Sequence, residues 1–537
     1  MLALCLLTCN FWRMISNQKQ SASNTGRGFI YAAIIMGSLA ISLDFASVDL
    51  ALPALEDQFG LNLETVQWVI NAYMLAFSVL MVTGGRLADG YGRKRVFLIG
   101  MAVFGFASLL GGAAWSGGSV IAFRVLQGVG AAMLWPAMIG MACAALGDDK
   151  RALALGLIFG SCSVGNAAGP VLGGALTQYL SWRWVLWVNV PMAVVAMLVT
   201  LWTIPWDRSE GARPKNDWAG MSLLTFGLVA FMLFIYQSDD WGLGDIRTIG
   251  LAVAAIALLG AFPFVENRIR EPLVPPDIMR NREIQVLCLC TMMICQLFFI
   301  VLLYFTQYGM KFLGEDPVQA GMRVVQFMLT YGVVSYFGGP LCKLMGTRQL
   351  ILIGLAAAMA ASILLGLAGP GGGWLVFNGA MILLGIGVGA VIPTISVRAI
   401  ECVGTSKAGL VSGITFLCQL AGAAAMLAIN TVIFAAVSAG RLNQYLATQH
   451  VTLTSVEQSA VNGVLRGPGS IHEIPAALAK EAGDAAELVE RAYGDGLQAV
   501  LWISAALVII TLFLVLRFVP GKKSPSPAES APVIAAG

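Results

Sequence analysis

The segment Phe29–Pro53 decides how the chain is interpreted, and it reads FIYAAIIMGSLAISLDFASVDLALP. As a helix it spans roughly 36 Å, which is enough to cross a bilayer. Two carboxylates interrupt this apolar run, Asp44 and Asp49. An aspartate at the centre of a membrane helix costs about 2.5–3.5 kcal/mol on insertion scales, so it usually faces a protein interior or a watered cavity. With Pro53 at the outer end, Asp44 lies roughly 13 Å inward and Asp49 roughly 6 Å, so only Asp44 is deep.

The composition agrees with a membrane protein. Hydrophobic residues make up 58% of the chain and charged residues 11%, whereas a soluble globular chain carries about 25% charged residues. This composition excludes a soluble globular protein. None of the ten cysteines falls in the largest polar loop, so no disulfide framework is expected.

The rest of the chain repeats the pattern of the first span. We predict about fourteen membrane helices in an all-α polytopic protein. The spans expected after the first are Val66–Thr83, Val96–Trp115, Ser119–Leu146, Ala152–Leu180, Trp184–Ile204, Trp218–Tyr236, Ile246–Val265, Ile284–Phe312, Val318–Leu344, Leu350–Leu367, Trp374–Arg398, Gly409–Ser438 and Leu497–Phe518.

Basic residues gather in alternate loops, for example at Arg93 after the second span and at Lys523 in the C-terminal tail. The positive-inside rule places these loops, and with them both termini, in the cytoplasm. The long polar segment 439–496 then faces outward, and its Ala/Glu-rich part, 474–493, is predicted to form a surface helix. Residues 1–17 lack the positive region and cleavage site of a signal peptide, and Met14 is an alternative start.

The loop after the second span carries the most specific pattern in the sequence. It reads GRLADGYGRKR over 85–95, with key positions Gly85, Asp89, Gly92, Arg93 and Lys94. The glycines allow two helices to turn back within a few residues, and the acid sits where cations and helix ends converge. A generic charged loop explains the basic residues but not their order. The pattern resembles the loop between helices two and three of the major facilitator superfamily, although Gly90 stands where that family usually has a basic residue.

The fifth span carries a second pattern of this family. Its positions are Gly156, Gly165, Gly169, Pro170, Gly173 and Gly174. Their spacing resembles the antiporter motif, which is found in the exporters of the family. Small residues let helices approach closely, and Pro170 removes an intrahelical hydrogen bond. We expect a kinked, tightly packed helix between the two halves, with a generic glycine packing face as the alternative.

The fourth span contains an R-x-x-Q-G-x-G pattern that is similar to a third motif of the family, formed by Arg124, Gln127, Gly128 and Gly130. Arg124 lies roughly 9 Å inside the membrane, between the depths of Asp49 and Asp44. An isolated buried arginine is costly, so we expect one of these two acids as its partner. The alternative is an arginine that extends outward to the membrane surface.

The first span resembles the L-D-x-T-I-V-N-V-A-L-P signature of the drug:proton antiporters with fourteen helices. Ala46 and Asp49 replace the usual Thr and Asn, which leaves three interpretations of Asp49: it fills a structural amide site, it adds a second titratable group, or it is a solvated interfacial acid. The resemblance extends from Phe29 to Phe518. It implies two six-helix halves with an inserted helix pair, and proton coupling at Asp44, Arg124 and Asp49. Alternating access then occurs around a site near the membrane midplane.

The resemblance also implies an organisation of the chain. The expected units are a cytoplasmic N-terminal segment (1–28), an N-terminal six-helix half (29–204), a linker with two extra helices (205–283), a C-terminal six-helix half (284–518) that includes the outward loop 439–496, and a cytoplasmic tail (519–537). The expected location is the plasma membrane, which is the inner membrane of a cell with two.

We therefore predict a multidrug-type exporter that uses the proton gradient and no cofactor or metal, rather than an enzyme. Its expected partners are a small-molecule substrate, protons and the lipid bilayer, but no nucleic acid. The sequence leaves open whether a periplasmic adaptor protein extends the path across a second membrane. No P-loop is present to bind a nucleotide. The alternatives are a dedicated exporter of one metabolite or siderophore, and a membrane sensor that transports nothing.

The charges inside the spans predict the charge of the substrate. Asp44, Asp49 and Arg124 give a cavity of at most one negative charge, so neutral or monovalent amphipathic compounds are expected. Aromatic residues that would supply apolar and cation–π surface if they face the cavity are Tyr73, Phe77, Trp135, Phe298, Phe305 and Phe416.

Overall fold

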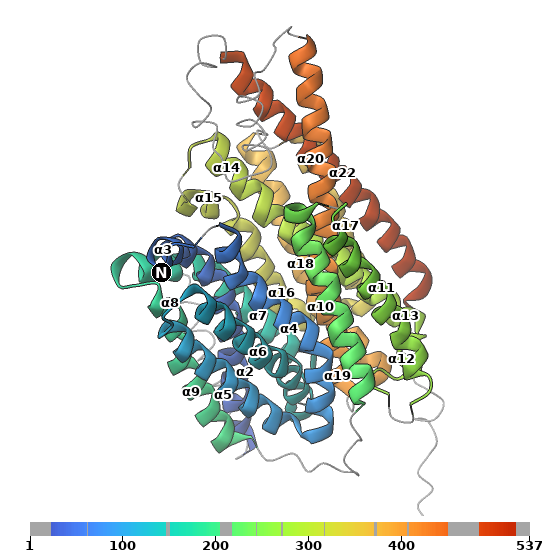
Figure 1. The fold of residues 1–537 in the computed structure, drawn as a ribbon. Helices are drawn as coiled ribbons and strands as arrows, with labels where there is room; N and C mark the ends of the chain where they lie inside the picture. The colour runs from blue at the N-terminus through green and yellow to red at the C-terminus, as the bar shows by residue number, and fades with distance from the viewer. Residues whose placement is uncertain are drawn as a thin grey trace, which may run out of the picture.

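The computed structural model of the protein describes residues 23–61, 63–146, 151–204, 217–242, 244–269, 272–315, 317–369, 373–404, 407–448 and 483–521. Within these ranges the regular structure is entirely helical. Long helices form one bundle, as Figure 1 shows. Thirteen of the described helices are long and apolar enough to cross a membrane. The prediction of an all-α polytopic membrane protein is confirmed.

The helices follow one another through short turns. The first part of the chain forms α2 (Ser23–Ser47), η1 (Val48–Ala51), α3 (Leu52–Phe59), α4 (Leu63–Tyr91), α5 (Arg93–Gly112), α6 (Gly117–Leu146), α7 (Arg151–Tyr179), α8 (Arg183–Trp187) and α9 (Asn189–Thr203). The middle part forms α10 (Trp218–Trp241), α11 (Ile246–Glu266) and α12 (Pro276–Met279). The last part forms α13 (Arg282–Ile300), η3 (Val301–Phe305), α14 (Thr306–Phe312), α15 (Pro317–Arg323), α16 (Val325–Met345), α17 (Thr347–Ala368), α18 (Trp374–Val403), α19 (Ala408–Leu417), η5 (Cys418–Gly422), α20 (Ala423–Thr448) and α22 (Gly483–Phe518).

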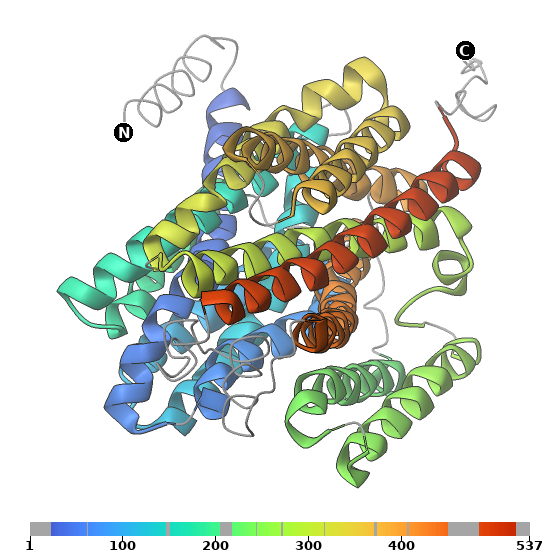
Figure 2. The same ribbon diagram turned by 90° about the horizontal axis from the view of Figure 1, so that it is seen from above.

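The bundle consists of two groups of helices and a peripheral pair. Most contacts of α2 to α9 lie within that group and most contacts of α13 to α22 within theirs; the two groups meet where α16 packs on α7 and where α19 packs on α4 and α6. Helix α10 packs chiefly on α11. Figure 2 shows this pair in green at the edge of the bundle. The predicted architecture of two halves and an inserted helix pair is confirmed. The boundaries assigned to the units stay predictions, and residues 1–22, 205–216 and 522–537 lie outside the described residues.

The two ends of the bundle differ. The end near α12 and α19 is called the lower end here, after its place in Figure 1. At the opposite, upper end, α20 and α22 project beyond the other helices. Residues 449–482, which connect these two helices, lie outside the described residues.

Helix α16 is the predicted span that is not apolar enough to count among the thirteen. It contains polar side chains such as Gln326, Tyr331 and Ser335. The helix packs between α7 and α18, and both Tyr331 and Ser335 are buried. The polar residues Tyr331 and Ser335 thus lie on the face packed against protein, while Leu329, Val333 and Phe337 form an exposed apolar face.

Helix α22 corrects the prediction of a separate surface helix over 474–493. It runs without a break from Gly483 to Phe518, so residues 483–493 form the first turns of the last span, while 474–482 lie outside the described residues. The Tyr493 side chain is buried, and its hydroxyl donates to the carbonyl oxygen of Tyr304 at 2.9 Å. The Tyr308 hydroxyl donates to Glu490 at 2.6 Å. These bonds and the burial of Tyr493 tie the extension of α22 to the bundle.

Glycines let α7 lie directly against α2. A Cβ atom added at Gly173 would lie 2.5 Å from the carbonyl oxygen of Ser47, and one added at Gly169 would overlap Ala46. Real Cβ atoms do not approach other atoms this closely, so larger residues at these positions would separate the two helices.

The other end of α7 meets the second half of the bundle. A Cβ atom at Gly156 would lie 2.8 Å from the carbonyl oxygen of Ser335 on α16. A Cβ atom added at Gly332 of α16 would likewise lie 3.0 Å from the Cβ atom of Ser163 on α7. The glycines of the predicted antiporter motif thus pack α7 on a helix of its own half and on a helix of the other half.

We predict that Gly169→Leu lowers the thermal stability of the purified protein. Overpacking of this kind costs about 1–3 kcal/mol, because α2 or α7 must move. The matched control is Gly260→Leu on α11, where an added Cβ atom meets no described atom within 4 Å. Thermal unfolding should therefore separate the two variants. Equal melting temperatures for both would contradict the close packing of α7 on α2.

Candidate functional site

Asp44 on α2 and Arg124 on α6 form an ion pair in the interior of the first half. The distance between Nη1 of Arg124 and Oδ2 of Asp44 is 2.6 Å, and the two side chains are 1% and 0% exposed. Arg124 Nε also donates to the carbonyl oxygen of Val69 on α4 at 2.9 Å. Burying two charges is costly unless their other donors and acceptors are also bonded.

Amide side chains complete the bonding of the Asp44 carboxylate. Its Oδ1 atom accepts from Gln127 Nε2 at 2.8 Å and from Asn189 Nδ2 at 2.7 Å. Gln127 also accepts from Arg124 Nη1 at 2.8 Å, and its Nε2 bonds to the Ser108 hydroxyl at 2.8 Å. The carboxylate therefore receives N–H donors from α6 and α9, while α5 supports Gln127.

Sequence patterns did not reveal Asn189 and Ser108. Asn189 is a single amide within the apolar span predicted over Trp184–Ile204, and this isolation was the available signal. Ser108 has no such signal, because serine is common in membrane helices.

Tyr73 on α4 covers the other side of Arg124. Its ring centre lies 4.2 Å from the guanidinium carbon, and the residue is fully buried. A cation over an aromatic face is attracted by the negative potential of that face, most strongly when water is excluded. Arg124 is therefore held by a carboxylate, an amide, a carbonyl oxygen and an aromatic ring.

Asp49 lies apart from this pair. It belongs to the short turn η1 and its side chain is exposed. Its carboxylate makes no hydrogen bond or ion pair within the part of the chain that the structure describes. Of the two predicted partners of Arg124, the structure places Asp44 against it.

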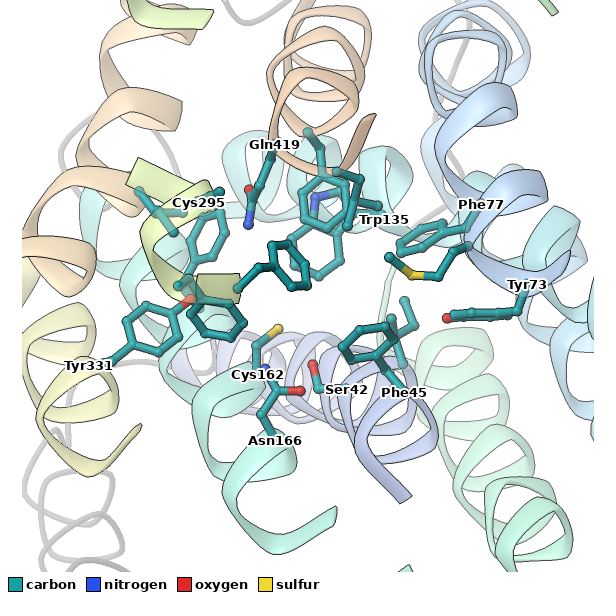
Figure 3. Close-up of a pocket in the computed structure, with 18 residues that line it drawn as sticks. Ser42, Phe45, Tyr73, Phe77, Trp135, Cys162, Asn166, Cys295, Tyr331 and Gln419 are labelled. Atoms are coloured by element: carbon teal, nitrogen blue, oxygen red, sulfur yellow. The ribbon is translucent and has the colours of Figure 1, made fainter. Parts of the chain in front are cut away.

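A cavity lies beside the ion pair, between the two halves of the bundle. The centre of a water-sized sphere can occupy about 90 Å³ of it, and Figure 3 shows the residues around it. Helices of both halves contribute its walls, and its lining includes no Asp, Glu, Lys or Arg. The lining residues are Ile41, Ser42, Phe45, Tyr73, Met74, Phe77, Trp135, Phe159, Cys162, Asn166, Cys295, Phe298, Phe299, Tyr331, Ile392, Phe416, Gln419 and Leu420.

Five of the six aromatic residues considered for the cavity line it. The exception is Phe305, which packs against Phe377 with ring centres 5.4 Å apart. Tyr331 lines the cavity from α16, while Arg323, at the end of α15, pairs with Glu315 at 2.5 Å.

Three polar atoms of the cavity residues have no hydrogen-bond partner among the described residues. They are the Tyr73 hydroxyl, Trp135 Nε1 and Asn166 Oδ1, and all three are buried. Figure 3 shows these side chains reaching toward the cavity. An unpaired buried polar atom costs about 1–3 kcal/mol, so a ligand with complementary groups would gain affinity here. Trp135 can only donate, Asn166 Oδ1 can only accept, and Tyr73 can do either.

The crossing of α4 and α19 closes the bundle below the cavity. At the bottom of α4, Asp89 accepts from the backbone N–H groups of Gly409 at 3.2 Å and of Leu410 at 2.8 Å. A carboxylate at a helix N-terminus is stabilised by the partial positive charge there. Higher up, Phe77 meets Phe416 with ring centres 5.4 Å apart. The two halves thus touch from Asp89 up to the floor of the cavity.

Glycines allow this crossing to be close. A Cβ atom at Gly413 would lie 2.8 Å from the carbonyl oxygen of Met81, and one at Gly85 would overlap the carbonyl oxygen of Gly409. Gly85 is therefore required by the contact between helices rather than by a turn.

The remaining loop residues fix the turn into α5. Gly92 has a φ of 101°, which favours glycine. Arg93 donates to the carbonyl oxygen of Gly140 at 3.0 Å and to Asp89 at 3.4 Å. Lys94 is buried and donates to the carbonyl oxygen of Leu201 at 3.1 Å. These basic side chains bind α4, α6 and α9 together at the lower end.

Comparisons with known proteins agree with this structure. The model of the family described as Major Facilitator Superfamily matches residues 34–427. The chain is 34% identical over 441 residues to the puromycin resistance protein pur8 of Streptomyces alboniger, covering 80% of this chain and 85% of that protein. It is 26% identical over 510 residues to the tetracenomycin C resistance and export protein of Streptomyces glaucescens, covering 93% and 92%. The crystal structure of the human organic anion transporter MFSD10 (TETRAN) shares the fold, with a TM-score of 0.60, 13% identity and coverage of 92% of this chain and 100% of that one.

We predict that Asp89→Asn opens the lower end more often. The amide loses the charge that binds the start of α19, a contribution of about 1–2 kcal/mol, or roughly a five- to thirtyfold change in the ratio of closed to open forms. Cys162 and Cys295 line the cavity, so the rate at which a maleimide labels them reports this opening.

The matched control for this prediction is Asp277→Asn. Asp277 pairs with Lys407 next to the start of α19 at 3.3 Å, but the pair is exposed and contributes little. Its labelling rate should equal that of the unmodified protein. An unchanged rate in Asp89→Asn would show that this contact does not hold the lower end closed.

Proposed function

The chain belongs to the Major Facilitator Superfamily, and from this premise we propose that it exports small amphipathic compounds in exchange for protons. The names of its relatives refer to antibiotic resistance and export, which supports efflux of the multidrug type. The observation that carries the proposal is the buried ion pair of Asp44 and Arg124 beside a cavity without charged walls. The proton gradient drives the exchange, without a cofactor.

Asp44 is the proposed proton carrier. As a carboxylate it neutralises Arg124 and accepts hydrogen bonds from Gln127 and Asn189. Protonation removes the negative charge, so the guanidinium loses its counter-ion and the packing of α2 against α6 and α9 changes. The proton then favours the state with a neutral Asp44, and the substrate favours the state with an ionised Asp44. Because each stabilises a different state, binding of one weakens binding of the other.

We infer that the lower end faces the cytoplasm, because the basic loop after α4 lies there. Both termini are then cytoplasmic, and the protein resides in the plasma membrane. The contact of Asp89 with α19 closes the cytoplasmic side in this structure. Transport requires this contact to break, so that the cavity becomes open to the cytoplasm. The projecting ends of α20 and α22 then face outward, on the side where an adaptor protein would bind if the path crosses a second membrane.

The cavity supports neutral or monovalent substrates. Aromatic side chains from both halves provide apolar surface, and none of the lining side chains is an acid that would attract a second positive charge. The directional polar atoms of Tyr73, Trp135 and Asn166 favour a narrower second function, the export of one class of compound with matching donors and acceptors. Efflux measured over a panel of chemically different compounds separates multidrug export from export of one class. Efflux from proteoliposomes that depends on a proton gradient would exclude a sensor that transports nothing.

We predict that Asp44→Asn abolishes proton-driven transport while the protein still inserts and folds. The amide keeps the shape of the side chain but cannot titrate. The matched control is Asp49→Asn, which changes an exposed acid of the same segment and should keep most of the activity. The measurement is substrate efflux against a concentration gradient in vesicles with an imposed pH difference. Efflux at the unmodified rate in Asp44→Asn would refute the assignment.

We also predict that the protein protects an efflux-deficient host against neutral and monocationic compounds but not against dications. Asn166→Asp would place an acid in the cavity wall and should extend protection to dications. The minimum inhibitory concentrations of matched mono- and dicationic agents measure both effects. Stronger protection against dications by the unmodified protein would show that substrate reaches a carboxylate outside the cavity described above.

A further inference from the structure

The proposed exchange requires substrate in the cavity to influence a proton site that it does not touch. Asp44 and Arg124 are absent from the cavity wall and are almost completely buried. Tyr73 lies between the two sites. The centre of its ring lies 4.2 Å from the guanidinium carbon of Arg124. Its hydroxyl reaches into the cavity and has no hydrogen-bond partner among the described residues. Figure 3 shows this orientation of Tyr73.

We propose that Tyr73 transmits substrate binding to the ion pair, and that the substrates which release a proton are those that donate a hydrogen bond to the Tyr73 hydroxyl oxygen. This inference rests on the proposed exchange of substrate for protons. It assigns Tyr73 two roles, a contact for substrate and a positioning residue for Arg124.

The direction of the effect follows from the cation–π contact. A donor bound to the hydroxyl oxygen withdraws electron density from the ring and draws the ring toward the cavity. Both changes weaken the attraction between the ring and the guanidinium. Arg124 then depends more on a negative Asp44. The Asp44 O–H bond breaks, its electron pair stays on the carboxylate, and the proton passes to water. Binding of such a substrate therefore favours proton release, as an exchanger requires.

Two further ionisable groups among the described residues interact with Arg124 or with Tyr73. Asp49 of η1 interacts electrostatically with Arg124, and Cys162 of α7 with Tyr73. The groups from α9 and α5 that complete the bonding, Asn189 and Ser108, do not titrate. The pair is thus sensitive to a change at Tyr73.

The test measures protons released per substrate bound, at saturating substrate, with purified protein in weakly buffered detergent solution. The probes are puromycin and ethidium, two aromatic compounds that carry amino groups able to donate hydrogen bonds. Tyr73→Phe keeps the ring over Arg124 and removes the hydroxyl. We expect it to bind substrate about three- to tenfold more weakly and, once saturated, to release less than about a third of the protons.

The matched control is Phe77→Leu. Phe77 lies one turn along α4 and lines the same cavity, but it contacts Phe416. This variant should lose affinity and keep the full proton release per bound molecule. Substrate affinity at two pH values also separates loss of affinity from loss of coupling to the proton. The affinity of Tyr73→Phe should depend less on pH than that of Phe77→Leu.

The outcomes separate the two proposals. Full proton release in saturated Tyr73→Phe, or an equal loss in Phe77→Leu, would overturn the role of Tyr73 while proton exchange stands. Absence of release in the unmodified protein when both probes bind would overturn the proposed exchange itself. Release that persists in Asp44→Asn would place the proton site elsewhere.

Discussion

The burial of one carboxylate governs this structure. Asp44 is fully buried, and an acid in that position is tolerated only if a cation and hydrogen-bond donors surround it. Arg124, Gln127 and Asn189 supply them from α6 and α9. This requirement fixes how α2 packs within the first half. It also explains why an amide lies within an otherwise apolar span.

Helix α4 links the parts of the site. At one end its backbone carbonyl at Val69 accepts from Arg124, and Tyr73 covers the guanidinium one turn later. Phe77 then meets the second half at the floor of the cavity, and Asp89 binds the start of α19 at the lower end. A shift of α4 therefore affects the ion pair, the cavity and the closed end together. Such a shared element is what coupling between a proton site and a substrate site requires.

The sequence predicted the helical membrane fold and the residues that form each motif. Both are encoded by short stretches of the chain, in the length of the apolar runs and in the spacing of the glycines. It also named Asp44 as one of two partners for Arg124, from their depths in the membrane and the cost of burying an unpaired arginine. It did not predict the position of Asn189, the direction faced by Phe305, or the continuity of α22. These features depend on how each helix is rotated against its neighbours, which the spacing of residues along one helix does not determine. The buried polar residues of α16, Tyr331 and Ser335, likewise have their reason in α7 and α18, which pack on that helix.

The central claim is that Asp44 carries the exchanged proton: substrate binding drives the proton from its carboxyl group and leaves the carboxylate that pairs with Arg124 in this structure. Infrared difference spectroscopy of the protein in lipid, recorded on addition of substrate, tests it most directly. The account predicts that a protonated-carboxyl band disappears, that a carboxylate band appears, and that both changes are absent in Asp44→Asn. Substrate binding without a change in the carboxyl region, or the same change in Asp44→Asn, would contradict it.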